Sequence, residues 1–314
     1  MDIIRKVAFG EDLNIYDDDG DDKQCPFTKA VKCAMHGLAY AEEHPWDQFN
    51  PSKRARQFRR DLSESAQFIR DSGRSCIEKQ LDLIRKGQPL THNVLAHILQ
   101  AACADADGLP EMEEMIDQFV TFFIAGQETT ANLLTWTIKE LTQKPQITYR
   151  LKTEVEAVLG GKSDIAFENL HKLEYTMAVL KESLRLYPPA TGSVREAPND
   201  CVFSGVKIPK GAIVVVLTYT MSRMEEYFKD PLTYDPDRFL HDEDKGMYAY
   251  FPFSLGPRSC IGQQFAMIEA RVVLSKLLQN FEFVWVPGQS DGMIEEVTTK
   301  PKDGCKCYIK LASP

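Results

Sequence analysis

The chain has 314 residues, of which 43% are hydrophobic and 26% charged, and its formal net charge is −9. That length allows one large domain or two smaller ones, each with a buried core. The acidic balance argues against nucleic acid as the main partner. The sequence has no run of about 18 apolar residues, so no membrane-spanning helix is predicted. Charged residues interrupt the early apolar stretch that a signal peptide would need.

The N-terminal part of the chain is predicted to consist of helices separated by acidic segments. Residues 17–22 are an acidic run that we interpret as a solvated turn. A calcium loop is the alternative, but the distal glutamate of an EF-hand is missing. A helix is predicted over residues 52–86, and its basic start favours a solvated face, with contact to anionic lipid as the alternative. Residues 105–114 are predicted to be a linker.

A long helix is predicted over residues 115–144, because apolar residues recur there at helical spacing until Pro145. It contains the segment AGQETT at residues 125–130. A glycine inside a helix costs about 1 kcal/mol relative to alanine. We therefore expect Gly126 to have a functional role, or to allow another helix to approach closely.

A second motif lies on a helix predicted over residues 176–187, which two prolines end. Glu182 and Arg185 stand three residues apart on it and share one face. An isolated pair of this kind contributes little when it is exposed. After the prolines the chain changes to short β-type runs, including residues 202–216, and the uncharged run at 211–222 is predicted to be a strand.

A third motif is the segment FSLGPRSCIG at residues 253–262, just before a helix predicted to start at Gln263. It places Cys260 between two glycines. Gly256 permits a tight turn, and Gly262 lets a flat ligand approach the backbone. A sulfur near the start of a helix is stabilised as the thiolate by the helix dipole. The alternative is a buried, inert cysteine.

In this order the three motifs resemble the oxygen-binding helix, the Glu-x-x-Arg helix and the heme loop of cytochromes P450. Residues 236–239, PDRF, are similar to the segment that carries the family's third partner, here Arg238. The resemblance implies a mostly α fold with small β-sheets. It implies a single P450 domain at residues 1–314, incomplete at the N-terminus and equivalent to the C-terminal two-thirds of the fold. Its core heme-binding region would span residues 115–285.

The resemblance also implies roles for individual residues. Cys260 is the thiolate ligand of the iron in heme b, a ligand that favours O–O cleavage. Glu128 and Thr129 are the acid–alcohol pair that carries protons to dioxygen. The other residues that it assigns to the cofactor are Arg258, Phe253, Gly262, Gly126 and, as a propionate partner, Arg195. It assigns a structural role to the cluster of Glu182, Arg185 and Arg238.

The activity that the resemblance implies is the hydroxylation of a sterol or another lipophilic small molecule. Dioxygen and electrons from NADPH, delivered by cytochrome P450 reductase, would be the co-substrates. The expected location is the cytosolic face of the endoplasmic reticulum membrane, although the chain contains no anchor. Two alternatives remain open. One is a truncated, inactive remnant or incomplete gene model, and the other is a heme protein that does not activate oxygen, as in isomerase or dehydratase members.

Three further expectations concern the C-terminal part. Arg271 and Lys276 are predicted to be exposed on the last core helix, where they would attract an acidic electron donor. Residues 297–299 resemble a substrate-contacting turn of the family. The eight cysteines are scattered and only Cys305 and Cys307 are close, so neither a disulfide framework nor a structural zinc site is predicted. Reducing surroundings fit this pattern best.

Overall fold

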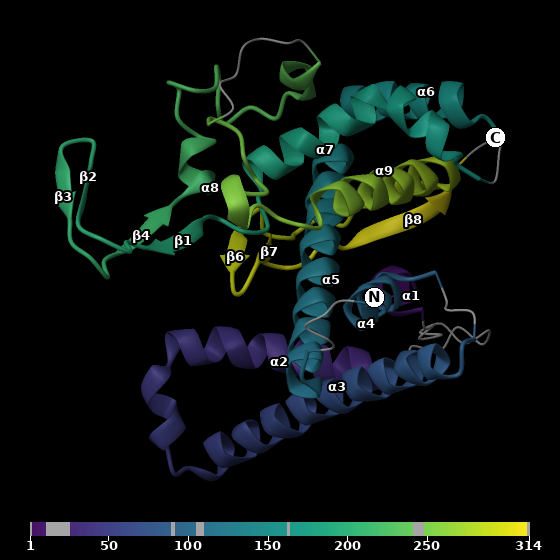
Figure 1. Ribbon diagram of the computed structural model, residues 1–314. Helices are drawn as coiled ribbons and strands as arrows, with labels where there is room; N and C mark the ends of the chain where they lie inside the picture. The colour runs from purple at the N-terminus through teal and green to yellow at the C-terminus, as the bar shows by residue number, and fades with distance from the viewer. Residues whose placement is uncertain are drawn as a thin grey trace. The chain divides into compact units, whose positions relative to one another are not determined.

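The structure is a computed structural model that describes residues 2–10, 26–88, 92–104, 110–161, 164–240 and 248–312 (Figure 1). Its contacts divide the chain into two compact units, Met1–Glu128 and Thr129–Pro314. The acidic run at residues 17–22 lies outside the described residues. Among the residues that are described, no helix combines the length and the apolar character needed to cross a bilayer.

The first unit is helical. Its core is aromatic: the rings of Phe9 and Phe119 lie 4.2 Å apart and those of Phe27 and Phe123 lie 4.7 Å apart. The helix predicted over residues 52–86 is confirmed, and the Ser52 hydroxyl caps it by accepting a hydrogen bond from the Ala55 amide at 3.2 Å. The elements of the unit are α1 (Asp2–Phe9), α2 (Pro26–Glu43), η1 (Pro45–Phe49), α3 (Lys53–Arg85), α4 (Val94–Ala104) and the first part of α5 (Met112–Gln143).

Helix α5 confirms the long helix of the sequence analysis and starts three residues earlier. Glu113 and Glu114 lie in its first turn, where negative charge is stabilised by the helix dipole. Glu113 also pairs with Arg70 and Arg74 of α3. The linker prediction was therefore wrong for residues 112–114, because acidic residues that suggest a loop also suit a helix N-terminus.

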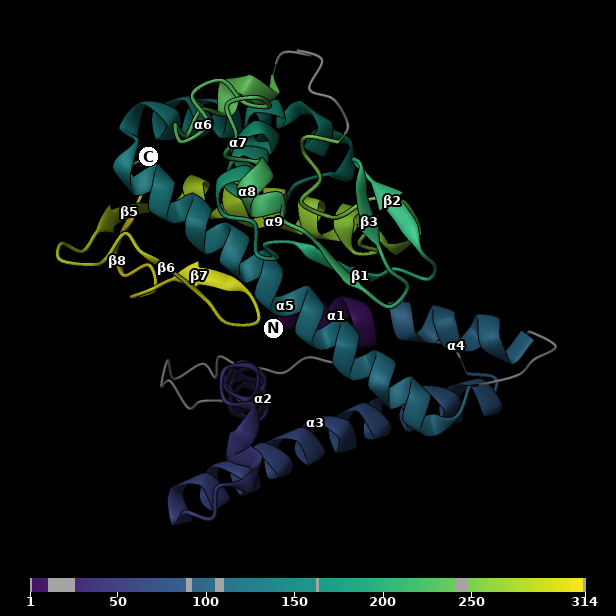
Figure 2. The ribbon, with the colours of Figure 1, turned by 90° about the vertical axis from the view of Figure 1, so that its left-hand side faces the viewer.

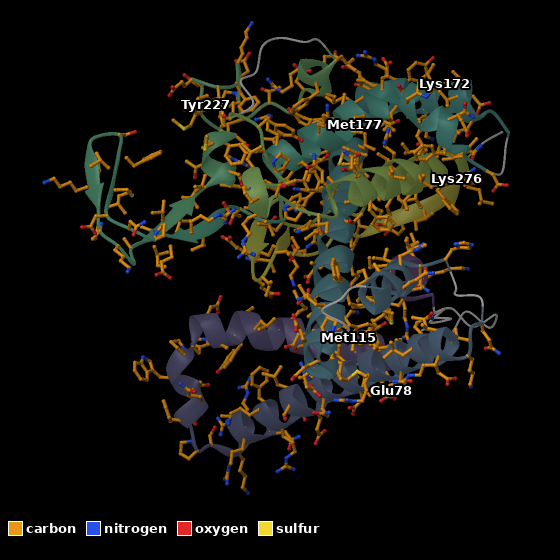
Figure 3. The ribbon with its side chains drawn as sticks, in the orientation of Figure 1. Glu78, Met115, Lys172, Met177, Tyr227 and Lys276 are labelled. Carbon is orange, nitrogen blue, oxygen red and sulfur yellow. The ribbon has the colours of Figure 1, made fainter. Side chains whose placement is uncertain are left out.

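The second unit is built on three packed helices, α7 (Glu174–Leu186), α9 (Gln263–Asn280) and the C-terminal part of α5. Leu133 of α5, Val179 of α7 and Leu274 of α9 belong to one buried cluster. Met177 of α7, labelled in Figure 3, packs against that cluster. The remaining helical elements are α6 (Pro145–Leu159), η2 (Phe167–Lys172), α8 (Thr218–Met221), η3 (Pro236–Phe239) and η4 (Gly256–Arg258).

Four antiparallel two-stranded sheets complete the second unit (Figure 2). The fold class, mostly α with small β-sheets, is confirmed. The strand predicted over residues 211–222 was too long. It ends at Val216, because Val216 pairs with Ser193, the first residue of the partner strand, and α8 follows. The sheets pair β1 (Ser193–Glu196) with β4 (Ile213–Val216), β2 (Cys201–Phe203) with β3 (Val206–Ile208), β5 (Phe281–Trp285) with β8 (Cys307–Leu311), and β6 (Met293–Glu295) with β7 (Thr299–Pro301).

Candidate functional site

The loop that precedes α9 is closed by its own backbone. The Cys260 amide donates to the Phe253 carbonyl at 2.8 Å, and the Ser259 amide donates to the Gly256 carbonyl at 3.0 Å. Gly256 has φ 77° and Ser254 has φ 60°, both in the left-handed region. For a serine that conformation costs about 1 kcal/mol, so the loop maintains it against a local preference.

This loop presents its sulfur outward. Residues 255–261 are all exposed, including Cys260 itself and Ile261, of which 86% is accessible. Gly262 is the N-cap of α9, so Cys260 stands directly before the start of a helix, where the positive end of the helix dipole lies. A Cβ added to Gly262 would lie 3.7 Å from the Cys260 sulfur, so a larger side chain would crowd the approach to it.

One arginine lies beside the loop and another lies within it. Arg195 of β1 donates to the Ser254 hydroxyl at 3.4 Å and to the Val194 carbonyl at 2.9 Å, which ties the strand to the loop. Arg258 lies within the loop and is exposed. Exposed guanidinium groups beside an apolar surface suit the carboxylates of a flat, otherwise apolar ligand. The loop and its neighbouring strand therefore offer one sulfur ligand, apolar side chains and two cations. This combination of groups fits heme.

The three residues assigned to a structural cluster come together in the structure. Arg185 is fully buried and donates to both carboxylate oxygens of Glu182, at 2.7 and 2.8 Å. It also donates to the Ser222 carbonyl at 2.7 Å and to the Pro231 carbonyl at 2.6 Å. Arg238 donates to Glu182 at 3.1 Å. The buried carboxylate is thus matched by two cations, and α7 is bonded to the chain that leads to the heme loop.

The residues assigned to oxygen activation lie on α5. Glu128 and Thr129 are consecutive and half-buried, and α5 is helical throughout its length. A Cβ added to Gly126 would lie 2.7 Å from Cδ1 of Ile4. Of the two explanations for Gly126, the structure therefore supports the close approach of another helix. A role of Gly126 at a cofactor stays a prediction.

The sequence analysis missed one residue near these positions, Asn132. Its amide donates to the Thr298 hydroxyl at 2.9 Å, and both side chains are buried. Thr299, next along the chain, donates to the Pro188 carbonyl at 2.7 Å. Asn132 stands three residues after Thr129, on the same side of α5. The available signal was an asparagine among the apolar residues of a predicted helix. The sequence could not identify its hydrogen-bond partner, which lies 166 residues away.

The two cations predicted to be exposed on α9 are half-buried, so that prediction was wrong. Arg271 donates to the Leu170 carbonyl at 3.0 Å, and burial lowers its pKa. Lys276, labelled in Figure 3, donates to the Gln279 side chain at 2.9 Å. The spacing of a cation along a helix is the same whether its side chain faces solvent or a neighbouring segment. For Arg271 the neighbouring segment is η2.

Comparison with known proteins gives a consistent result. The family model for cytochrome P450 matches residues 1–307. Cytokinin hydroxylase of Arabidopsis thaliana is 33% identical over 98% of this chain and 59% of its own length. Cytochrome P450 4A10 of Rattus norvegicus is 33% identical over 74% of this chain and 45% of its own length. The 11-oxo-beta-amyrin 30-oxidase of Glycyrrhiza uralensis is 34% identical over 80% of this chain and 50% of its own length.

A crystal structure of the cytochrome P450DA heme domain superimposes on the whole of this chain with a TM-score of 0.86 at 25% identity, and the match covers 66% of that protein. The chain thus spans about half the length of the curated relatives that it matches. Members of the matched family are heme-thiolate proteins that carry heme b. The matched family model, the shared fold and the outward-facing loop cysteine agree, and the chain belongs to the cytochrome P450 family.

Proposed function

We propose that this chain is part of a heme-thiolate monooxygenase, with Cys260 as the ligand of the heme iron. The observation that carries the proposal is the exposed sulfur on a loop whose geometry is fixed by the bond between the Cys260 amide and the Phe253 carbonyl. Residues 1–314 would then belong to one P450 domain, with the heme-binding region within residues 115–285.

Bound at this loop, heme would supply the activation of dioxygen that places one oxygen atom in a C–H bond of the substrate. The role of the chain would be to hold and tune it. The Cys260 thiolate would donate electron density to the iron. Arg258 and Arg195 would bind the two carboxylates at the edge of the ring. Phe253 and Gly262 would leave room for its flat face.

Proton delivery would fall to Glu128 and Thr129. The Thr129 hydroxyl can both accept and donate a hydrogen bond, so it can pass a proton that a carboxyl such as Glu128 supplies. The bond between Asn132 and Thr298 would hold the turn at residues 297–299 against α5, one turn further along that helix. The turn that the resemblance assigns to substrate contact would then be positioned by α5 itself.

For the substrate we propose a sterol, because several runs of the sequence resemble cholesterol 24-hydroxylase, a member of the family. The support is the set of runs at residues 119–126, 180–190, 250–266 and 286–289. The matched relatives are named for different substrates, among them cytokinin and 11-oxo-beta-amyrin. NADPH–cytochrome P450 reductase as electron donor and the endoplasmic reticulum membrane as location belong to the same proposal.

The test is a spectrum of the protein reconstituted with heme, reduced and exposed to carbon monoxide. We expect the red-shifted Soret band of thiolate ligation. It should be absent in Cys260→Ser and retained in Cys201→Ser, which alters an exposed cysteine of β2. A missing band in the parent protein would refute the proposal and favour the inactive alternative. Tighter binding of cholesterol than of a straight-chain fatty acid would test the sterol part separately.

A further inference from the structure

Cys305 and Cys307 form a close pair of thiols far along the chain from the heme loop. Their sulfurs lie 3.6 Å apart, and both side chains are free and half-buried. Residues two apart in an extended segment point to the same face, which explains the proximity. A disulfide has sulfurs about 2.05 Å apart, so the two atoms need to approach by about 1.5 Å.

The backbone between the two sulfurs is held by Gln289. The Gln289 side chain accepts a hydrogen bond from the Lys306 amide and donates to the Lys306 carbonyl, each at 2.8 Å. The Val286 amide donates to the same carbonyl at 3.2 Å. Cys307 is itself the first residue of β8, paired with Trp285 of β5. Because the peptide units are fixed, the remaining approach falls to rotation of the two side chains.

A metal ion is the other group that two close thiols can bind. Two ligands of a tetrahedral zinc lie about 3.8 Å apart, which is near the observed spacing. However, the described part of the chain holds no group of three or more candidate ligands. Lys139, of which only 3% of the side chain is exposed, acts electrostatically on Cys305, and its positive charge opposes a cation there. The site therefore favours bond formation between the sulfurs.

We propose that Cys305 and Cys307 form a reversible disulfide by exchange with a low-molecular-weight disulfide such as oxidised glutathione. The Cys307 thiolate attacks one sulfur of oxidised glutathione and releases the other half as a thiolate. The Cys305 thiol then loses its proton and attacks the Cys307 sulfur, releasing the second half. The protein loses two electrons and two protons, and one glutathione disulfide becomes two thiols.

The order of attack follows from the surroundings of the two thiols. Burial, and next the neighbouring Cys307, raise the pKa of the Cys305 thiol, so Cys305 is the weaker first nucleophile. Lys139, which is ion-paired with Asp291 at 3.1 Å, partly opposes this rise, and it would stabilise Cys305 as the thiolate in the second step.

The modification would act on a segment that contacts α5. Residues 286–306 lie between β5 and β8, and the cysteine pair stands at the end of the segment. Within it, Asp291 pairs with Lys139 and Thr298 bonds to Asn132, both on α5. Closing the disulfide would therefore restrain a segment that is anchored to this helix at two points. The proposal does not depend on heme.

The full chain is first reduced and then equilibrated with about 0.1 mM oxidised glutathione. After acid quenching, free thiols are alkylated, and the protein is unfolded and digested with trypsin. Trypsin cleaves after Lys302 and Lys310, so both cysteines fall within residues 303–310. The bond after Lys306 lies inside the small ring that the disulfide closes and is protected from cleavage there. We expect residues 303–310 to be recovered as one peptide with an internal disulfide, about tenfold in excess over peptides that carry glutathione, because short links give effective concentrations of millimolar order.

Two variants test the order of attack, and a third is the control. Cys305→Ser should accumulate glutathione on Cys307, and Cys307→Ser should react far more slowly. Cys201→Ser, which alters an exposed cysteine of β2, should give the peptide with the internal disulfide at the parent level. Glutathione on both Cys305 and Cys307 without joining, or joining only between different molecules, would overturn the proposal. The parent protein alone decides this point, whatever the stability of the variants.

Discussion

Replacement of Arg185 by lysine should destabilise the second unit strongly, although the charge is kept. The guanidinium donates to Glu182, to Ser222 and Pro231, and at 3.1 Å to the Thr233 carbonyl. A lysine ammonium has three donors on one atom and cannot reproduce this fork. We expect the pair with Glu182 to survive and the carbonyls of Ser222 and Pro231 to lose their donor.

The magnitude follows from the acceptors that are left. Ser222 and Pro231 are buried, so their carbonyl oxygens have no water to replace the lost donor. A buried unsatisfied group costs about 1–3 kcal/mol, so the two together cost about 2–6 kcal/mol. Arg185→Ala would also remove one of the two cations that match the buried Glu182 carboxylate and leave Arg238 alone beside it. Breaking a buried pair costs about 3–5 kcal/mol, which approaches the whole stability of a typical domain. Lysine is therefore the informative substitution.

The assay is urea unfolding followed by tryptophan fluorescence. Trp136 is fully buried and stacked on Tyr187, with ring centroids 4.2 Å apart, so it reports on this unit. With a slope of about 2 kcal/mol per M, the midpoint of Arg185→Lys should fall by about 1–3 M. The matched control is Arg150→Lys, since Arg150 pairs with Asp237 at the surface and is 49% exposed. Such pairs are worth about 0.5 kcal/mol. Equal midpoints for the two variants would refute the reasoning.

Three further predictions concern single side chains. Burial raises the pKa of Glu269, and one carboxylate oxygen has no partner. The folded state therefore holds a proton more tightly than the unfolded state, and stability falls as pH rises above about 4.5. Glu269→Gln should raise the free energy of unfolding at pH 7 by up to about 1 kcal/mol. A higher melting temperature at pH 7, and an unchanged one below pH 4, would show this. Gly73→Ala should lower urea stability by about 1–3 kcal/mol, because the new Cβ would lie 2.6 Å from the Phe119 ring. Gly126→Ala meets only the flexible end of Ile4, and combined with Ile4→Val it should be at least as stable as Ile4→Val alone; a further loss in the double variant would contradict the packing explanation.

The parts that the sequence predicted well are those that local physics determines. Helices α3, α5, α7 and α9 follow apolar spacing and end at proline or at capping residues, so their positions were predictable to within a few residues. The loop at Cys260 was predictable because its glycines and proline restrict the backbone locally. What the sequence could not give was the environment of charged side chains. Lys139 and Arg271 look like ordinary helix-surface cations until their neighbours are known.

The contribution of the Glu182–Arg185 pair to stability depends on residues that are distant in the sequence. Three residues apart on an exposed helix, the pair would contribute little. In the structure the same pair is fully buried, and three carbonyl groups from residues 222–233 complete the coordination of the guanidinium. Those acceptors lie 37 to 48 residues away in the chain. Cys305 and Cys307 follow the same logic, since their spacing becomes chemically meaningful only through Gln289, which holds the backbone between them. A local motif thus indicates where a site can be, and the distant segment that packs against it determines what the site can do.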